Sequence, residues 1–99
     1  MESFNQVILS GVVNGHALLA KTSNGTSAIF EVETTQMYRR DGEKAFEPEI
    51  HVVKMKDAGT IAKYLTDGKP ILVVGRLKPS MGTAYVNALH ISFPDRRMS

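Results

Sequence analysis

The chain has 99 residues and a net charge of +2, from 12 Lys and Arg against 10 Asp and Glu. This length holds one domain and excludes multidomain machinery. Hydrophobic residues at 42% and charged residues at 22% are globular proportions and exclude a disordered chain. Because the sequence has no cysteine, disulfides, thiolate nucleophiles and cysteine metal sites are excluded. The mild basic excess permits a nucleic-acid partner without requiring one.

Neither membrane insertion nor secretion is expected. The longest apolar runs, Ile71 to Val74 and Val7 to Leu9, are far shorter than the roughly 18 residues that cross a bilayer. The N-terminus contains Glu2 and Asn5 and has no basic region followed by a long apolar stretch, which predicts a cytoplasmic protein. So short a chain buries only about 60 to 65% of its unfolded surface, so self-association would add stability.

A first strand is predicted from Phe4 to Val13, with Gly11 as a bulge or bend. Val7, Ile8 and Leu9 are consecutive apolar residues, and side chains of a strand alternate between its faces. Both faces of this strand are therefore expected to be covered. Since a barrel covers only the inner face, the outer face needs a partner.

The next two β-prone runs, Ala17 to Thr22 and Ser27 to Thr35, are joined by Asn24-Gly25. Asn-Gly is a strong hairpin signal because both turn positions take positive φ. In the second run, one face carries Ala28, Phe30, Val32 and Thr34, while the other carries Glu31, Glu33 and Thr35. This alternation predicts a half-buried strand with Phe30 in the core.

A polar arm follows from Gln36 to Glu49, with Asp41-Gly42 as a turn, and leads into a strand from Ile50 to Met55. Asp57 is the expected N-cap of a short helix that ends at Gly68, just before Pro70. The apolar face of this helix has the i, i+3, i+4, i+7 spacing and comprises Ala58, Ile61, Ala62 and Leu65.

The last two strands are predicted from Lys69 to Lys78 and from Thr83 to Phe93, around a tight turn at Pro79 to Gly82, with a frayed tail from Pro94 to Ser99. The order predicts an all-β domain spanning 1–99, a five-stranded OB-fold Greek-key barrel with one short α-helix between strands 3 and 4. A split α+β sheet with the helix on one face is the alternative.

Two groups of motifs follow one another along the chain. The first comprises Asn5 to Gly11, Asn24-Gly25, Thr34-Thr35, Tyr38 and Arg39. The second comprises Ala62, Tyr64-Leu65, Gly68 and Gly75-Arg76-Leu77. No single motif is diagnostic, but in their order and spacing together the residues from about Asn5 to Phe93 resemble the bacterial-type single-stranded DNA-binding proteins. The resemblance implies an OB-fold that binds single-stranded DNA, and a homo-oligomer, with a tetramer favoured and a dimer as the alternative.

The chain also departs from the family pattern. Ile50-His51 stands where the family has Trp-His, and there is no tryptophan. The turn at Pro79 to Gly82 replaces a long loop that carries an aromatic residue. The chain ends in Asp95-Arg96-Arg97-Met98-Ser99 rather than in a long linker with an acidic tip, so recruitment of partners through a tail is not expected.

A sequence-tolerant binder of single strands needs a basic groove with flat surfaces for the bases. Tyr38 and Tyr85 are predicted to stack bases, and the residues predicted to contact phosphates are Arg39, Lys54, Lys56, Arg76 and Lys78. Four of these residues have an alternative interpretation: Tyr38 as a packing residue of the arm, Tyr85 as a core or rim residue, and Lys54 and Lys56 as the solvated face of a half-buried strand. Phe46 either pins the arm or touches DNA, and Tyr64 is expected to pack.

The arm from Gln36 to Glu49 sums to −1, so one subunit should bind weakly and several should bind together. No acid–base constellation or metal-ligand spacing is present, and His16, His51 and His90 are isolated. The leading hypothesis is a non-enzymatic coat for single-stranded DNA in replication, recombination or repair, with no cofactor. The alternative is an accessory OB-fold protein, such as a primosomal, plasmid or phage factor, that acts mainly through protein contacts.

Overall fold

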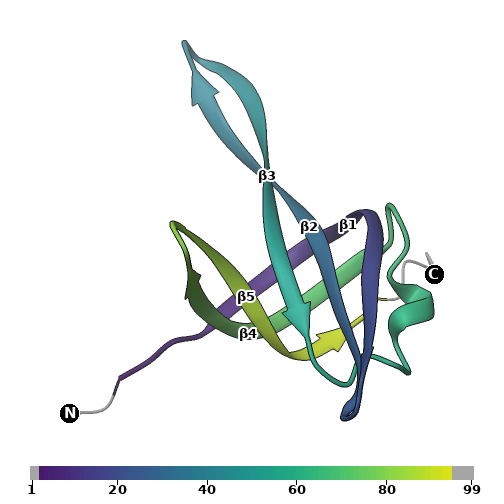
Figure 1. Ribbon diagram of the computed structural model, residues 1–99. Coiled ribbons are helices and arrows are strands. Elements are labelled where there is room, and N and C mark those ends of the chain that lie inside the picture. Colours follow the sequence, from purple (N-terminus) through teal and green to yellow (C-terminus); the bar gives the residue numbers. More distant parts are fainter. Residues whose placement is uncertain (1–2, 95–99) are drawn as a thin grey trace.

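Figure 1 shows the computed structural model of the chain, which describes residues 3–94. The strands are β1 (Val7–Thr22), β2 (Gly25–Arg40), β3 (Glu43–Met55), β4 (Pro70–Ser80) and β5 (Thr83–Ser92). They close a barrel in the order β1-β2-β3-β5-β4. β3 and β5 are parallel, and the other pairs are antiparallel. This confirms the predicted all-β OB-fold rather than the split α+β sheet. Of the frayed tail predicted from Pro94 to Ser99, residues 95–99 lie outside the described residues.

β1 is one long strand whose two parts pair with different neighbouring strands of the barrel. Its first part pairs with β4 from Val7 to Val12, and its second part pairs with β2 from Val12 to Thr22. The break predicted at Gly11 lies instead between Asn14 and Leu18, where the register shifts and Gly15 has a φ of 76°. Gly11 has another role, because a Cβ built there would lie 2.1 Å from the carbonyl oxygen of Glu33. Glycine therefore permits the close approach of β1 to β2.

The two predicted turns differ in geometry. Asp41 and Gly42 have φ values of 54° and 82° and connect the paired residues Arg40 and Glu43, as a two-residue hairpin turn requires. The turn expected at Asn24-Gly25 lies one residue earlier, because Thr22 already pairs with Gly25. The Thr22 hydroxyl donates to the Gly25 carbonyl at 3.0 Å and accepts from the Asn24 N–H at 3.2 Å. The threonine side chain thus holds this turn.

The prediction of an α-helix after Asp57 is wrong. Between β3 and β4 there is only a 3₁₀ turn, η1 (Ala62–Tyr64). Asp57 has a left-handed φ of 55° and is not a helix N-cap. A helix this short is marginal in water, and Gly59 weakens it further. The apolar stripe still points inward, because Ala58 and Leu65 are buried. The segment thus packs against the barrel through its own apolar side chains, and this packing does not require a helical backbone.

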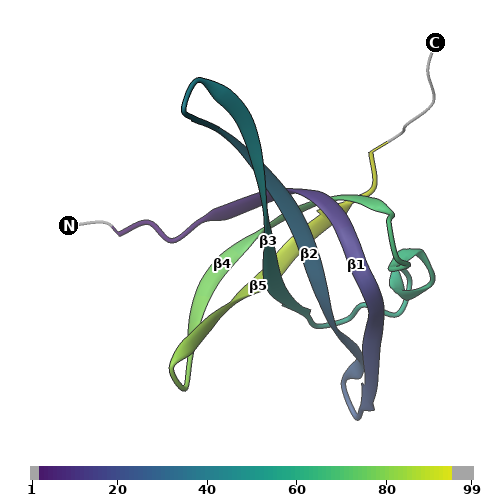
Figure 2. The same cartoon turned by 90° about the horizontal axis from the view of Figure 1, so that it is seen from above.

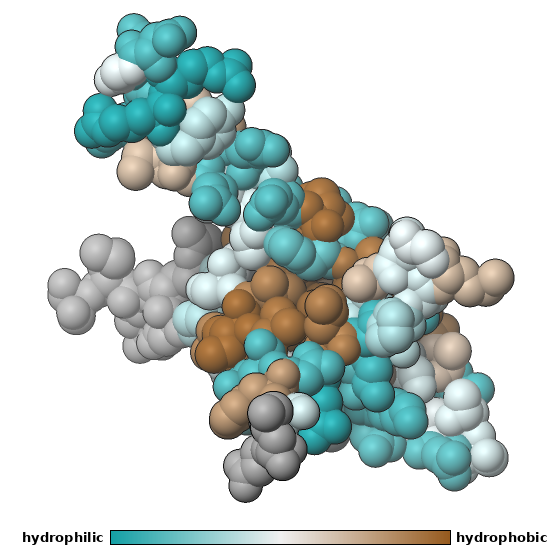
Figure 3. Space-filling model, turned by 90° about the vertical axis from the view of Figure 1, so that its left-hand side faces the viewer, coloured by the Kyte–Doolittle hydropathy of each residue, from teal (hydrophilic) through white to brown (hydrophobic). Residues whose placement is uncertain are grey.

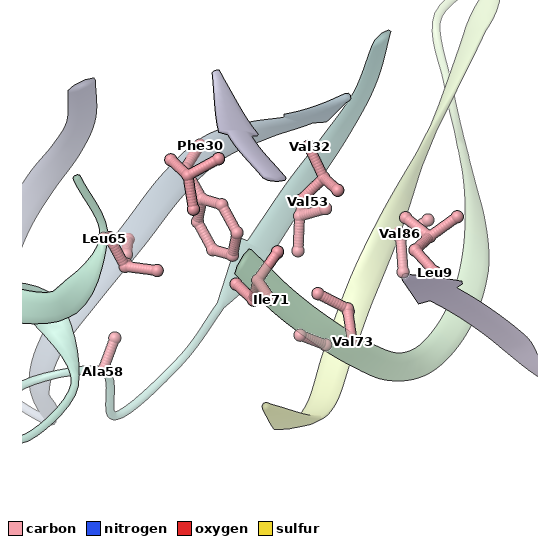
Figure 4. Packing of buried hydrophobic residues seen from close by; sticks show 12 residues of the cluster. Leu9, Phe30, Val32, Val53, Ala58, Leu65, Ile71, Val73 and Val86 are labelled. Atoms are coloured by element: carbon pink, nitrogen blue, oxygen red, sulfur yellow. The ribbon is translucent and has the colours of Figure 1, made fainter. Parts of the chain in front are cut away.

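The core fills the barrel interior with alternate residues of the strands (Figure 4). Phe30 is 2% exposed, which confirms its predicted burial, and its neighbours on the inner face of β2, Ala28 and Val32, are fully buried. The ring of Phe30 lies between Leu65 on one side and Val53 and Ile71 on the other. Burial of this face fixes which residues of each strand point outward.

The hairpin of β2 and β3 extends beyond the barrel as an arm, and the pairing continues without a break from Thr34 and Glu49 to Arg40 and Glu43. Figures 1 and 2 show this arm projecting from the barrel, with the β4–β5 turn and η1 on opposite sides. Between residues 3 and 94, no helix has the length and apolar character to cross a membrane.

Candidate nucleic-acid interface

The candidate site lies on the outer surface where β3, β5 and β4 meet. Val53 and Val86 pair with each other and are buried in the barrel, so the next residues along these strands point outward. Lys54 is opposite Asn87 across the β3–β5 pair. On the other side of β5, Arg76 is opposite Asn87 and Lys78 is opposite Tyr85. The register therefore places three basic side chains around one tyrosine and one asparagine.

Tyr85 is the aromatic centre of this surface. The Nζ atom of Lys54 lies over its ring, 4.1 Å from the centroid, which is a close cation–π contact. The Tyr85 side chain is half-buried and borders a pocket of about 190 Å³. Its lining includes Ile29, Lys54, Met55, Lys56, Tyr85 and Asn87. A positive charge, an aromatic ring and a shallow recess thus lie together, which suits an unpaired base with its phosphate.

The charge around this surface is uniformly positive on the β4–β5 side. From Gly68 to Pro94 the sequence contains Lys69, Arg76 and Lys78 and no carboxylate. Arg76 and Lys78 are exposed, so their charges are available to a ligand. In the sequence, Asp67 directly precedes this stretch and Asp95 directly follows it. Glu31 and Glu33 lie on the outer face of β2. A polyanion is therefore attracted to the β3–β5–β4 surface rather than to β2.

The structure brings five of the seven predicted site residues together on this surface: Lys54, Lys56, Arg76, Lys78 and Tyr85. Tyr38 and Arg39 lie instead on the arm, and as successive residues of β2 they point to opposite faces of it. Asn87 was missed by the sequence reasoning, although its spacing of two from Tyr85 places it on the same face of a strand. Met55 is half-buried against the core.

Two other residues named in the sequence analysis, Tyr64 and His51, lie away from this surface. Tyr64 stacks in a tilted arrangement on Phe93, with ring centroids 5.5 Å apart, in agreement with the packing role expected for it. His51 Nε2 is 2.9 Å from the Thr34 hydroxyl oxygen, so this histidine has a hydrogen-bond partner on the neighbouring strand. Among residues 3–94, no three His, Asp or Glu side chains gather in a group that could hold a metal ion.

The sequence matches the family model described as "Single-strand binding protein family" over residues 4–85. The chain therefore belongs to the single-strand binding protein family, whose members bind single-stranded DNA, and this is also the function of this protein. A search of curated proteins returns no match.

The fold of this chain is similar to those of solved single-stranded DNA-binding proteins. The small single-stranded DNA-binding protein from Streptomyces coelicolor is 22% identical, with a TM-score of 0.74 over 90% of this chain and 93% of that one. The Plasmodium falciparum SSB complex with ssDNA is 20% identical, with a TM-score of 0.81 over 96% and 98%. A deletion mutant of the single-stranded DNA binding protein from Thermus aquaticus is 23% identical, with a TM-score of 0.79, and this chain covers 52% of it.

Proposed function

We propose that the protein coats single-stranded DNA without sequence preference during replication, recombination or repair in the cytoplasm, and that it acts by binding alone, without a catalytic step. The observation that carries this proposal is the outer surface of β3, β5 and β4, where Tyr85 lies among Lys54, Arg76 and Lys78. An aromatic ring accepts any base by stacking, and lysine and arginine contact phosphates that are the same in every sequence.

Binding should weaken with salt in proportion to the number of phosphates neutralised. For single strands, the slope of log K against log salt is about −0.7 per phosphate, so Lys54, Lys56, Arg76 and Lys78 together predict a contribution of about −2.8 per subunit. Fluorescence titration with oligo-dT over a range of salt concentrations measures this slope. Arg76→Ala should reduce its magnitude by about 0.7 per subunit. No binding to oligo-dT at low salt would refute the proposed function.

The protein is proposed to work as a homo-oligomer, with a tetramer favoured over a dimer. Ile8 and Leu89 are 62% and 58% exposed on the outside of the barrel. Ile8 is opposite Val74 across the β1–β4 pair, so apolar side chains adjoin there. Figure 3 shows apolar surface gathered on this side of the molecule, below the mostly hydrophilic arm. An exposed apolar patch of neighbouring side chains is typical of an interface with another protein surface.

Light scattering should therefore give a solution mass near four times the 10.9 kDa of one chain for a tetramer, or near twice the mass of one chain for a dimer. Ile8→Asp should shift the mass toward one chain, because a carboxylate in an apolar contact loses its hydration. An unchanged mass in this variant would place the contact elsewhere. If single chains bind oligo-dT tightly, cooperation between subunits is not the source of affinity.

The same measurements separate the accessory-protein alternative from the proposed coat. Replacement of Lys54 and Tyr85 would weaken DNA binding by a coat protein. A protein that acts mainly through protein contacts would keep its binding to those partners after the same replacement.

A further inference from the structure

The outer surface of β1, β2 and the end of β3 forms a second face of the barrel, termed here the β1–β2 face. Residues that are directly opposite in neighbouring strands share a face, so three rows of side chains cross it. The rows comprise Val12, Glu33 and Ile50; Asn14, Glu31 and Val52; and Leu18, Ile29 and Lys54. Val13, Phe30 and Val53, which alternate with these residues, are buried in the barrel, so the rows point outward.

Four apolar side chains of this face are open to solvent. Leu18 is 71% exposed, Ile50 47%, Ile29 41% and Val52 38%. Leu18 and Ile29 are directly opposite each other, and Ile29 and Val52 are diagonal neighbours across β2 and β3. Exposed apolar side chains that adjoin in this way are typical of an interaction site rather than of an ordinary solvated surface.

These side chains border a recess of about 390 Å³ at the break in β1. The pairing of β1 with β2 shifts register between Asn14 and Leu18, which interrupts the ladder at this point. The lining of the recess includes Asn14, His16, Leu18, Ile29, Glu31 and Val52. The Asn14 side-chain amide donates to Glu31 Oε1 at 2.9 Å and so holds this exposed carboxylate beside the apolar side chains.

The charge of the β1–β2 face is opposite to that of the candidate DNA interface. Glu31 and Glu33 lie at its centre, on β2. Lys54 is the one cation of the three rows, and its Nζ atom lies over the ring of Tyr85 on β5, which directs this charge toward the neighbouring surface. A polyanion is therefore repelled by the β1–β2 face, whereas a cationic group is attracted.

The combination of carboxylates and apolar side chains decides the class of partner. Single-stranded DNA would bring its phosphates close to Glu31 and Glu33, and like charges at short distance oppose binding. A protein segment can instead bury Leu18 and Ile29 under apolar side chains and place a cationic group against Glu31. An apolar centre bordered by charged groups is the usual arrangement of protein interfaces.

We propose that the β1–β2 face docks a segment of a partner protein that presents an arginine or lysine beside large apolar side chains. The cationic group pairs with Glu31 at the recess, and the apolar side chains cover Leu18 and Ile29. Ile29 also lines the recess beside Tyr85, so the docked segment lies next to the DNA interface, while Arg76 and Lys78 are on the far side of β5. This inference goes beyond the proposed function and does not depend on it.

An NMR titration of the isotope-labelled protein with a short peptide tests the docking site. In extended form, the peptide leucine-serine-arginine-serine-leucine presents both leucines and the arginine on one side, because side chains alternate. It should shift the backbone amide signals of residues 12–18, 29–33 and 50–52. Two control peptides, one with glutamate for arginine and one with serine for both leucines, should bind at least about fivefold more weakly.

Two matched pairs of variants locate the contact. Leu18 and Leu19 are both exposed but point to opposite sides of β1. Leu18→Ser should therefore weaken peptide binding by at least about fivefold, and Leu19→Ser by less than about twofold. Glu31→Gln and Glu43→Gln change the net charge equally, but only Glu31→Gln should weaken peptide binding, by about 2- to 5-fold.

The other occupants of this face give different results. No amide shifts with the peptide, or equal losses in Leu18→Ser and Leu19→Ser, would overturn the docking site. If Leu18→Ser lowers the solution mass without peptide, a second copy of the chain covers the face, and the inference is wrong. If Leu18→Ser weakens binding to oligo-dT as much as binding to the peptide, the face belongs to the DNA path, and the inference is again wrong. If the peptide binds as expected but oligo-dT does not bind, the proposed function fails and this inference stands.

Discussion

The double variant Lys54→Ala/Tyr85→Ala is expected to bind oligo-dT at least about 100-fold more weakly than the unmodified protein, because it loses a stacked base and a phosphate contact together. Lys54 Nζ lies 4.1 Å from the centre of the Tyr85 ring, so the two side chains form one unit, and their effects should not simply add. Fluorescence titration at constant salt measures the loss, and circular dichroism checks that the barrel remains folded.

A second lysine–tyrosine pair on the other side of the barrel supplies the control. Lys63 Nζ lies 5.2 Å from the ring centre of Tyr64, in η1, away from the candidate interface. The variant Lys63→Ala/Tyr64→Ala removes the same charge and the same ring, and its DNA affinity should fall by less than about threefold. Equal losses in the two double variants would show that binding is not localised at β3, β5 and β4.

The largest effect on stability is expected for Phe30→Ala, which should lower the free energy of unfolding by about 3 to 5 kcal/mol. The ring is 2% exposed at the centre of the core, so its removal leaves a cavity among Leu65, Val53 and Ile71. A small domain has only about 5 to 15 kcal/mol in total, so this single change removes much of its stability. Thermal unfolding followed by circular dichroism should show a fall in Tm of more than about 12 °C.

Ile29→Ala is the matched control for this experiment. Ile29 is the neighbour of Phe30 on β2 but points outward and is 41% exposed, so its truncation should cost less than about 1 kcal/mol. If both variants lose the same stability, the inner and outer faces of β2 have been assigned incorrectly.

The strands could be predicted because their signals are local. Ala28, Phe30 and Val32 alternate with Ser27, Ile29 and Glu31, and this period of two identifies a strand with one buried face without reference to any other segment. Asp41-Gly42 marks a turn because these residue types tolerate positive φ, and both adopt it. Such signals do not depend on which strands become neighbours.

The segment after Asp57 shows where a local pattern misleads. Its apolar spacing fits a helix, but the same spacing only requires that Ala58 and Leu65 reach the core, and a loop with one 3₁₀ turn achieves this. The Ala58 N–H donates to the Thr26 carbonyl at 2.7 Å, so a contact with the start of β2, distant in the sequence, directs this backbone. A sequence pattern contains no information on that contact.

The amino-acid sequence alone predicted an all-β barrel with Phe30 in its core, and a list of basic and aromatic residues suited to single-stranded DNA. Only the tertiary structure decided which of them act together. The register of β3, β5 and β4 places Lys54, Arg76 and Lys78 around Tyr85 and Asn87, and the register of β2 and β3 separates Arg39 from Tyr38. The physical reason is that pairing between strands sets the side on which each charge lies, and this depends on residues far apart in the chain.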